Sequence, residues 1–141
     1  MDDDGMTPIA DVTMESAAGY AQKISAGPYR LTADEPESRG GTAIGPTPYT
    51  LLLSALGACT AITLRMYADR KSWALGTIDV HLRMLKSKDG RERIERELRF
   101  GASLTDEQRT RLVEIAGKTP VTKTLQVGLP IATTVAEQPS G

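Results

Sequence analysis

The segment that opens at Thr47 constrains the fold most, because it predicts a long helix with no polar face in its first half. Thr47 is a suitable N-cap, and Pro48 suits the first helical position, where its missing N–H group is not needed. The apolar residues that follow cover nearly the whole circumference: Leu51, Leu52, Leu53, Ala55, Leu56, Ala58, Ala61, Ile62, Leu64 and Met66. A helix that is apolar on every side requires cover on every side, so we predict a central buried helix.

Segments typical of strands lie on both sides of this helix. Before it, the sequence predicts strands at Ile9–Glu15, Ala21–Ser25 and Tyr29–Ala33, followed by a loop from Asp34 to Pro46. After it, the sequence predicts a hairpin of Thr77–Leu85 and Glu92–Phe100, a helix capped by Thr105, a short helix from Pro120 to Leu125, and a closing strand at Ile131–Val135. Strands grouped in runs favour the α+β class, with an antiparallel sheet wrapped on the central helix.

The second strand of the predicted hairpin, Glu92–Phe100, alternates imperfectly. Ile94, Leu98 and Phe100 share one face of this strand with the charged residues Glu92 and Arg96. Arginines and glutamates alternate along the strand, and we interpret them as cross-strand pairs that favour solubility rather than as a site for a polyanion.

Length and composition narrow the classes of function. The 141 residues suit a single domain spanning 1–141, with residues 1–7 and 137–141 expected to be flexible. The net charge of -1 argues against a nucleic-acid partner, and no apolar run uninterrupted by charge is long enough to indicate a membrane span. The acidic start and the single cysteine indicate a cytoplasmic protein. One cysteine and one histidine cannot form a metal cluster, so we expect no metal and no cofactor.

Two motifs carry a resemblance to a known family. The run GPTPYTLLLSALGACT, residues 45–60, resembles the cysteine-helix motif of the OsmC/Ohr family (osmotically inducible protein C and organic hydroperoxide resistance protein). The run KTPVTKTL, residues 118–125, resembles the family's second motif, in which Cys-Pro opens a helix. The resemblance implies an OsmC-like fold and an intertwined homodimer with active sites near the subunit interface. It also implies reduction of organic hydroperoxides by a cysteine pair that a dithiol reduces again.

The chain departs from the family pattern at three positions. Thr119 stands where the family has its second, resolving cysteine, and the family's glutamate falls at Tyr49 or Thr50. The family's arginine falls within residues 18–20, where this chain has none. Without a second cysteine no internal disulfide can form, so an external thiol must reduce Cys59 after oxidation. The predicted site therefore contains Cys59 and Thr119, with Tyr49 and Thr50 in its pocket.

Cys59 is the predicted attacking thiol. A cysteine attacks a peroxide oxygen as a thiolate and becomes a sulfenic acid, and the ordinary thiol pKa of about 8.5 requires a nearby cation to lower it. Cys59 lies about three turns into its helix, too far for the helix dipole to help much. Arg39, in the long loop, is the first candidate for this cation, followed by Arg65 and Arg30. The alternative is that Cys59 fills space and that Thr119 only caps a helix.

Two functions are consistent with these residues. The first is thiol-dependent reduction of organic hydroperoxides, with Cys59 as the peroxidatic thiol and an external dithiol as the reductant. The second is a non-catalytic small-ligand-binding or stress-related protein that kept the fold. In that case the cleft between two subunits holds a small apolar ligand, and Cys59 only lines it. The missing cysteine, glutamate and arginine motivate the second hypothesis.

Overall fold

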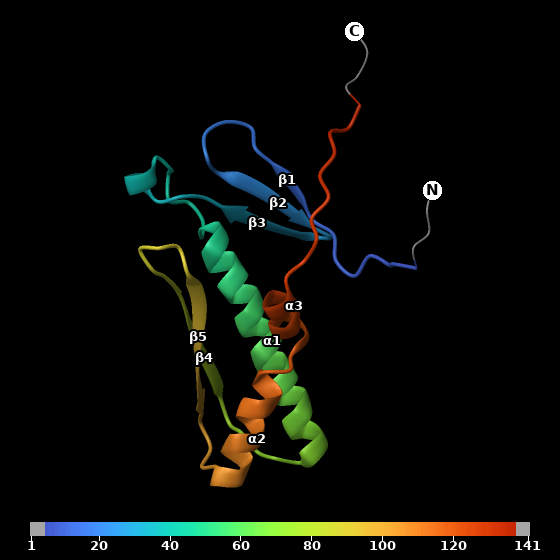
Figure 1. Ribbon diagram of the computed structural model, residues 1–141, viewed down its shortest axis with the longest axis vertical. Coiled ribbons are helices and arrows are strands. Elements are labelled where there is room, and N and C mark those ends of the chain that lie inside the picture. Colours follow the sequence, from blue (N-terminus) through green and yellow to red (C-terminus); the bar gives the residue numbers. More distant parts are fainter. Residues whose placement is uncertain (1–4, 138–141) are drawn as a thin grey trace. The chain divides into compact units, whose positions relative to one another are not determined.

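The computed structural model describes residues 5–137, so parts of the predicted flexible ends, 1–4 and 138–141, lie outside the described residues. The elements follow the order β1 (Thr13–Glu15), β2 (Gln22–Ala26), β3 (Tyr29–Ala33), a 3-10 turn (Glu37–Arg39), α1 (Pro48–Lys71), β4 (Ile78–Lys86), β5 (Glu92–Phe100), α2 (Asp106–Ala116) and α3 (Pro120–Val127) (Figure 1). The α+β class, with antiparallel strands and a central helix, is confirmed. Two compact units, divided after Ser54, are described separately below.

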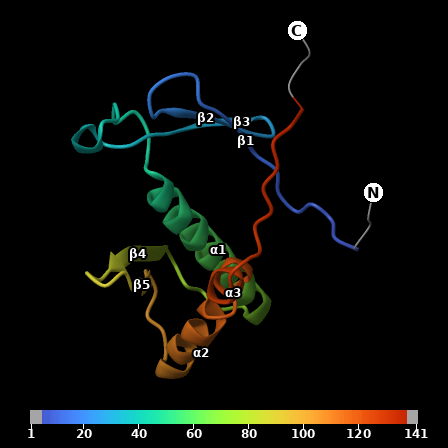
Figure 2. The same cartoon turned by 45° about the horizontal axis from the view of Figure 1, so that its top comes forward.

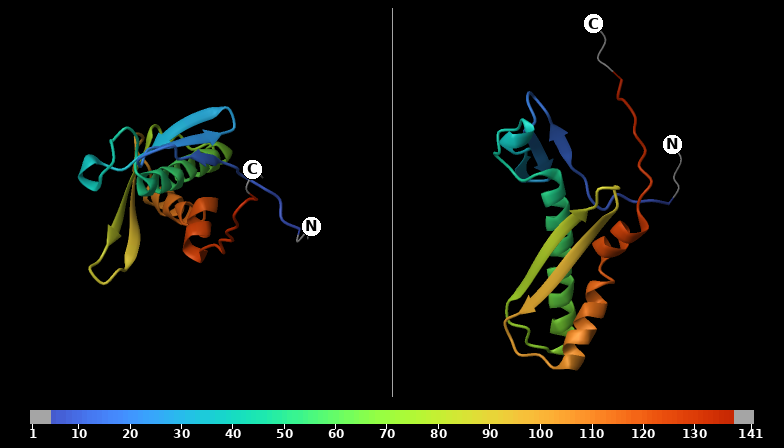
Figure 3. Two further views of the ribbon diagram at one scale, coloured as in Figure 1. Left: turned by 90° about the horizontal axis from the view of Figure 1, so that it is seen from above. Right: turned by 60° about the vertical axis from the view of Figure 1, so that its left-hand side comes forward.

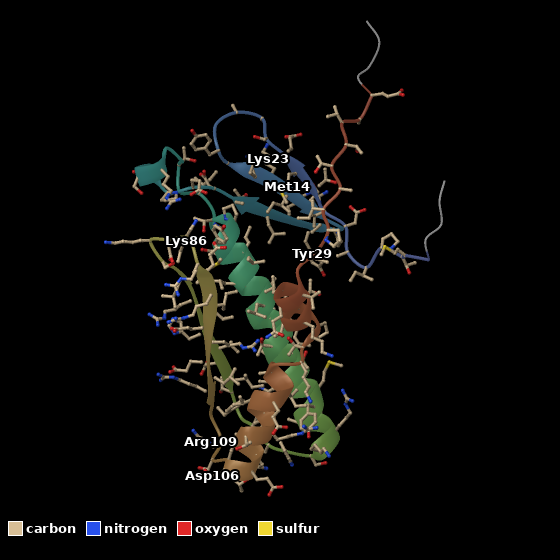
Figure 4. The ribbon with its side chains drawn as sticks, in the orientation of Figure 1. Met14, Lys23, Tyr29, Lys86, Asp106 and Arg109 are labelled. Carbon is tan, nitrogen blue, oxygen red and sulfur yellow. The ribbon has the colours of Figure 1, made fainter. Side chains whose placement is uncertain are left out.

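The first unit contains an antiparallel meander in the order β1-β2-β3 (Figure 2). Met14, Lys23 and Tyr29 mark the three strands in Figure 4. β1 begins at Thr13 rather than at the predicted Ile9, whose side chain is 99% exposed. β2 and β3 lie within one residue of their predicted bounds, because the turn at 27–28 separates them.

A buried carboxylate organises the loop that follows β3. Asp34 is 2% exposed, and its Oδ2 accepts the Thr42 hydroxyl at 2.6 Å and the Ile44 N–H at 3.3 Å, while Oδ1 accepts the Glu35 N–H at 2.7 Å. The Thr42 hydroxyl is the largest cause that holds the pKa of the Asp34 carboxyl below its ordinary value, although burial opposes it. At Gly41 the loop passes so close to itself that a Cβ would lie 1.9 Å from the Glu35 carbonyl oxygen. The loop is therefore internally braced.

The second unit packs the β4–β5 hairpin and α2 against the later turns of α1 (Figure 1 and Figure 3). Its core consists of five buried apolar side chains from α1, α2 and the connection after α1: Leu64, Ala68, Leu75, Leu112 and Ala116. The inward face of the hairpin covers this core with Ile78, Leu98 and Phe100. Lys86 lies at the turn end of the hairpin, and Asp106 and Arg109 lie in the first turns of α2 at its other end (Figure 4).

Local capping chemistry sets the ends of the shorter helices. Thr105 and Gln108 form a complete capping box at the start of α2, as predicted. Thr119 caps α3, with Pro120 at the first helical position, and α3 continues to Val127, two residues beyond the predicted end. Gly117 follows the last residue of α2 as its C-cap.

Two expectations differ from the structure of the single chain. Helix α1 is buried along one stripe, Leu56, Thr60, Leu64 and Ala68, rather than on every side. The predicted strand at Ile131–Val135 is wrong, because this segment forms no strand and its two end residues are 86% and 89% exposed. An alternating apolar segment becomes a strand only where a sheet edge offers it hydrogen bonds, and periodicity alone cannot supply that edge.

Helix α1 is long and apolar enough to cross a membrane, judged by length and composition alone. No charged residue precedes Arg65 in this helix. The core helix of a soluble protein passes the same test. In this structure 22% of the apolar window is buried, and Leu64 and Ala68 of α1 belong to the packed core of the second unit.

Candidate functional site

Cys59 is a half-buried free thiol on α1, in the second unit. Thr60, the next residue along the helix, accepts a hydrogen bond at 2.9 Å from the guanidinium of Arg96 on β5. Burial lowers the pKa of Arg96, and the nearby Cys59 opposes that shift. The structure therefore places an arginine that the sequence analysis had assigned to surface pairing beside the turn that carries Cys59.

Three hydrogen bonds fix the Arg96 guanidinium between the helices. Nη1 donates to Thr60 Oγ1 at 2.9 Å and to Thr122 Oγ1 at 3.0 Å. Nη2 donates to the carbonyl oxygen of Ala116, the last residue of α2, at 2.8 Å. This carbonyl belongs to a helix C-terminus, where backbone acceptors lack helical partners and a cation is favoured. Arg96 thus joins β5 to α1, α2 and α3 at one point.

The hydroxyls around Arg96 are withdrawn from solvent. Thr60 and Thr119 are both 0% exposed, and Thr122 is buried. The Thr119 and Thr122 hydroxyl oxygens are 2.6 Å apart, so Thr119 is linked to Arg96 through Thr122. The second-motif position predicted from sequence therefore belongs to the same network of residues as the turn of α1 that carries Cys59.

Packing of the hairpin on α1 brings Arg96 to the cysteine turn. Arg96 pairs with Leu82 in the β4–β5 register. A Cβ built at Gly57 would lie 2.9 Å from the Leu82 side chain, so the missing side chain of Gly57 lets β4 approach the helix two residues before Cys59. The close approach at Gly57 is thus made by a side chain of the hairpin.

Arg39, Tyr49 and Thr50, the other residues predicted for the site, lie in the first unit. Arg39 and Tyr49 line a small pocket of about 310 Å³. The Thr50 hydroxyl lies 2.9 Å from that of Thr47, next to the start of α1. The pairing of Arg39 with Cys59 stays a prediction.

The second and third cation candidates occupy exposed positions. Arg65 is exposed on α1, and Arg30 Nη1 donates to the backbone carbonyls of Gly27 and Tyr29 at 2.9 Å each. The Arg30 side chain is therefore engaged in the turn of its own hairpin.

One signal in the sequence could have found Arg96. It lies between Ile94 and Leu98 on the face of β5 that turns toward the core, where a solubilising arginine is out of place. Other arginines of the hairpin behave as interpreted: Arg83 pairs across the strands with Glu95, and both side chains are exposed.

A groove of about 1060 Å³ lies beside Arg96. It runs between β5 and α2, and its lining includes the apolar side chains of Leu98, Phe100 and Val113 together with Arg96 and Arg109. Among the described residues, no group of three or more His, Cys, Asp or Glu side chains could hold a metal ion. The arrangement therefore offers a thiol, a fixed cation and an apolar surface.

Comparisons with known proteins agree with this architecture. A family model described as OsmC-like protein matches residues 40–134. An OsmC-like protein from Mycoplasma pneumoniae is similar in structure (TM-score 0.72, 21% identity, 86% of this chain and 89% of that chain covered). So is the organic hydroperoxide resistance protein OhrB of Bacillus subtilis (TM-score 0.59, 23% identity, 83% and 90% covered).

An organic hydroperoxide resistance protein from Legionella pneumophila also shares the fold (TM-score 0.66, 14% identity, 86% of this chain and 91% of that chain covered). At these identities the solved structures establish the fold alone. A search of curated proteins found no match to the sequence. The family model covers about two thirds of the chain and includes both Cys59 and Thr119. The chain therefore belongs to the OsmC-like protein family.

Proposed function

We propose that this protein reduces organic hydroperoxides with Cys59 as the attacking thiol and Arg96 as its cation. The observation that carries the proposal is the hydrogen bond of the Arg96 guanidinium to Thr60 Oγ1 at 2.9 Å, which holds a cation beside the turn of α1 that carries Cys59. Catalytic cysteines react as thiolates, and a nearby cation is one of the features that activate them. The solved structures named as hydroperoxide resistance proteins add support at the level of the family.

The reaction has two stages. In the first, the Cys59 thiolate attacks one oxygen of the hydroperoxide, the O–O bond breaks, and the alcohol leaves as an alkoxide that takes up a proton. The Cys59 sulfur is oxidised to a sulfenic acid, and the peroxide is reduced to an alcohol. Arg96 stabilises negative charge on the sulfur and on the departing oxygen.

An external dithiol completes the cycle. One of its thiols displaces water from the sulfenic acid to form a mixed disulfide with Cys59, and its second thiol then releases Cys59 and leaves as a disulfide. Thr119 has no sulfur with which to carry out this step inside the chain. A reducing compartment such as the cytoplasm suits this requirement.

We also propose that the protein works as a homodimer, with the second copy covering α1. In the single chain Ile62 and Met66 of α1 are 60% and 54% exposed. A large exposed apolar surface on a helix of a folded domain is typical of an interface. Light scattering of wild type and of Ile62→Glu tests this proposal, because it measures the molar mass of the particle in solution. A dimer requires that the mass measured for wild type be twice the mass of one chain.

A second candidate function is binding of a small apolar ligand without turnover. The groove between β5 and α2, with Leu98, Phe100 and Val113 in its lining, favours this candidate. In that case Cys59 is only a neighbour of the ligand site.

One experiment separates the two candidates. Cumene hydroperoxide and a dithiol are added to wild type, Cys59→Ser and Arg96→Ala, and peroxide loss is followed. If the protein is a peroxidase, Cys59→Ser is expected to lose activity. The rate of Arg96→Ala is expected to decrease by at least about tenfold, which corresponds to the loss of one hydrogen bond to a charged group. Equal rates in wild type and Cys59→Ser would overturn the peroxidase and leave the binding protein.

A further inference from the structure

The proton of each buried hydroxyl beside Arg96 has an assigned acceptor. Thr60 Oγ1 donates to the Leu56 carbonyl at 2.7 Å, and Thr122 Oγ1 donates to the Ala116 carbonyl at 3.2 Å. A hydroxyl has one proton and two lone pairs, so both oxygens are left to accept from Arg96. Both threonines are therefore oriented as acceptors for the guanidinium.

Thr119 completes the set through Thr122. Since the Thr122 proton is used on the Ala116 carbonyl, the short contact of 2.6 Å is made by the Thr119 proton, donated to Thr122 Oγ1. The Thr119 oxygen in turn accepts the Thr122 backbone N–H at 3.4 Å. Thr122 Oγ1 then accepts two hydrogen bonds and donates one, which uses its full capacity.

The network also determines which donors of Arg96 are available. A guanidinium carries five N–H groups. Among the residues that the structure describes, the recorded bonds use two on Nη1 and one on Nη2. The Nε–H and the second Nη2–H are left for a thiolate or a peroxide oxygen. Without the threonines only the bond from Nη2 to the Ala116 carbonyl would hold the guanidinium, and the N–H groups of Nη1 would lose their fixed acceptors.

We propose that Thr60 and Thr122 are positioning residues for the chemistry of Cys59, acting through Arg96, and that Thr119 orients Thr122. This inference deepens the proposed function and rests on it for its biological meaning. It assigns a role to the hydroxyl at the second-motif position: Thr119 supports a one-thiol site instead of supplying a second thiol. The positioning residues touch neither the sulfur nor the substrate.

A purely structural role is the alternative, because Thr119 caps α3 and Thr122 binds the end of α2. Such a role would lower thermal stability and leave the reactivity of Cys59 in the folded protein unchanged. The pH profile of Cys59 alkylation by iodoacetamide separates the two roles, since only the thiolate reacts.

The experiment compares Thr60→Val and Thr122→Val with Thr122→Ser and with Arg96→Ala. Each valine variant removes an acceptor of Arg96 and keeps the side-chain shape, so alkylation at neutral pH is expected to slow about threefold and the profile to move to higher pH. Thr122→Ser is expected to restore the wild-type profile. Arg96→Ala is expected to slow alkylation about tenfold. Thr124→Val, an exposed change on α3, is the matched control.

A double variant makes the test decisive. Thr122→Val adds nothing to Arg96→Ala if it acts through the guanidinium, whereas independent effects multiply. The inference would be overturned if both folded valine variants kept the wild-type alkylation profile. It would also be overturned if the rate decreases of Thr122→Val and Arg96→Ala multiplied in the double variant. Circular dichroism identifies the folded variants, and Thr60→Val provides the test if Thr122→Val does not fold. Alkylation requires no peroxide turnover, so failure of the peroxidase proposal would be visible separately.

Discussion

Arg96 on β5 donates from Nη1 to the hydroxyl oxygen of Thr60 on α1 over 2.9 Å, although 36 positions separate the two residues. Because Thr60 directly follows Cys59, this bond ties the cation to the turn of α1 that carries the thiol. Thr60 is fully buried, and a hydrogen bond to a charged group is strong where water is excluded. The stability of the fold and the proposed thiol chemistry would therefore depend on the same side chain.

The first prediction concerns the stability provided by Arg96. Arg96→Ala removes one donor each from the Ala116 carbonyl, Thr60 Oγ1 and Thr122 Oγ1, so the free energy of unfolding is expected to decrease by about 1–3 kcal/mol. Urea denaturation followed by circular dichroism measures this loss. Arg99→Ala is the control, since Arg99 is exposed and its pair with Glu97 contributes at most about 1 kcal/mol. Equal losses in the two variants would contradict the anchoring role of Arg96.

Local chemistry made most of the secondary structure predictable. Thr47 and Pro48 predict the start of α1, and Thr105 predicts the start of α2, because the hydrogen bonds of a helix cap join residues within one turn of each other. The prediction of a strand at Ile131–Val135 was wrong. A strand must pair with the edge of a sheet, and that edge lies elsewhere in the chain or in another copy, so the local sequence does not reveal it.

The candidate site was predictable in part. Cys59 and Thr119 stay predictions from their motifs, and Arg96 joins them only through the structure, because its partners are 36 and 26 positions away and leave no local pattern. Because charged residues surround Arg96 on β5, the sequence analysis interpreted it as one of a series of exposed cross-strand ion pairs. Its place on the apolar face, between Ile94 and Leu98, was the signal against that interpretation.

The second prediction tests the capping box of α2. Thr105→Ala removes the acceptor for the Gln108 N–H, so the free energy of unfolding is expected to decrease by about 1 kcal/mol. Thr110→Ala, an exposed change inside the same helix, is expected to be neutral or slightly stabilising, because alanine is the better helix former. Thermal or urea denaturation measures both, and a loss confined to Thr110→Ala would refute the prediction.

The third prediction concerns the pH dependence of the braced loop. The pKa of Asp34 is lowered from 3.8, first of all by the Thr42 hydroxyl, so the unfolded chain binds the proton more readily than the folded one. The stabilisation is therefore fully present above about pH 3.8 and is lost as the pH falls further, through the lower folded-state pKa. The carboxyl carbon of Asp34, followed by NMR against pH, reports the folded-state pKa.

The Thr42 variants make this test specific. Thr42→Val is expected to raise the pKa of Asp34 toward its ordinary value and to speed hydrogen exchange at the Ile44 amide, while Thr42→Ser preserves both. An unchanged pKa of Asp34 in Thr42→Val would remove the hydroxyl as the main cause.

The fourth prediction concerns the close backbone approach at Gly41. A Cβ there would lie 1.9 Å from the Glu35 carbonyl oxygen, a distance that requires the backbone to move. Gly41→Ala is therefore expected to destabilise the protein by about 1–3 kcal/mol or more. Gly117→Ala is the control, because its nearest contact would be 3.5 Å and its backbone is in the right-handed helical region. Comparable unfolding midpoints for both variants would contradict the steric argument.

The fifth prediction restores a second thiol. Thr119→Cys places a sulfur where the Thr119 hydroxyl now stands, 2.6 Å from Thr122 Oγ1, which in turn binds Arg96. After one equivalent of hydroperoxide, the sulfenic acid at Cys59 is expected to condense with the introduced thiol, forming an S–S bond and releasing water. Mass spectrometry should then detect a chain that has lost two hydrogens, and dimedone should trap little sulfenic acid.

Two controls show whether position 119 is decisive. Thr119→Ser keeps the hydroxyl and the cap, so its sulfenic acid is expected to survive until an external thiol arrives. Thr110→Cys places an equally new thiol on the exposed surface of α2, where no internal disulfide is expected at the same peroxide dose. If Thr119→Cys retained a trappable sulfenic acid, or if Thr110→Cys formed the disulfide as fast, position 119 would not adjoin the reactive sulfur. The absence of a second thiol at position 119 would then not explain the proposed requirement for an external thiol.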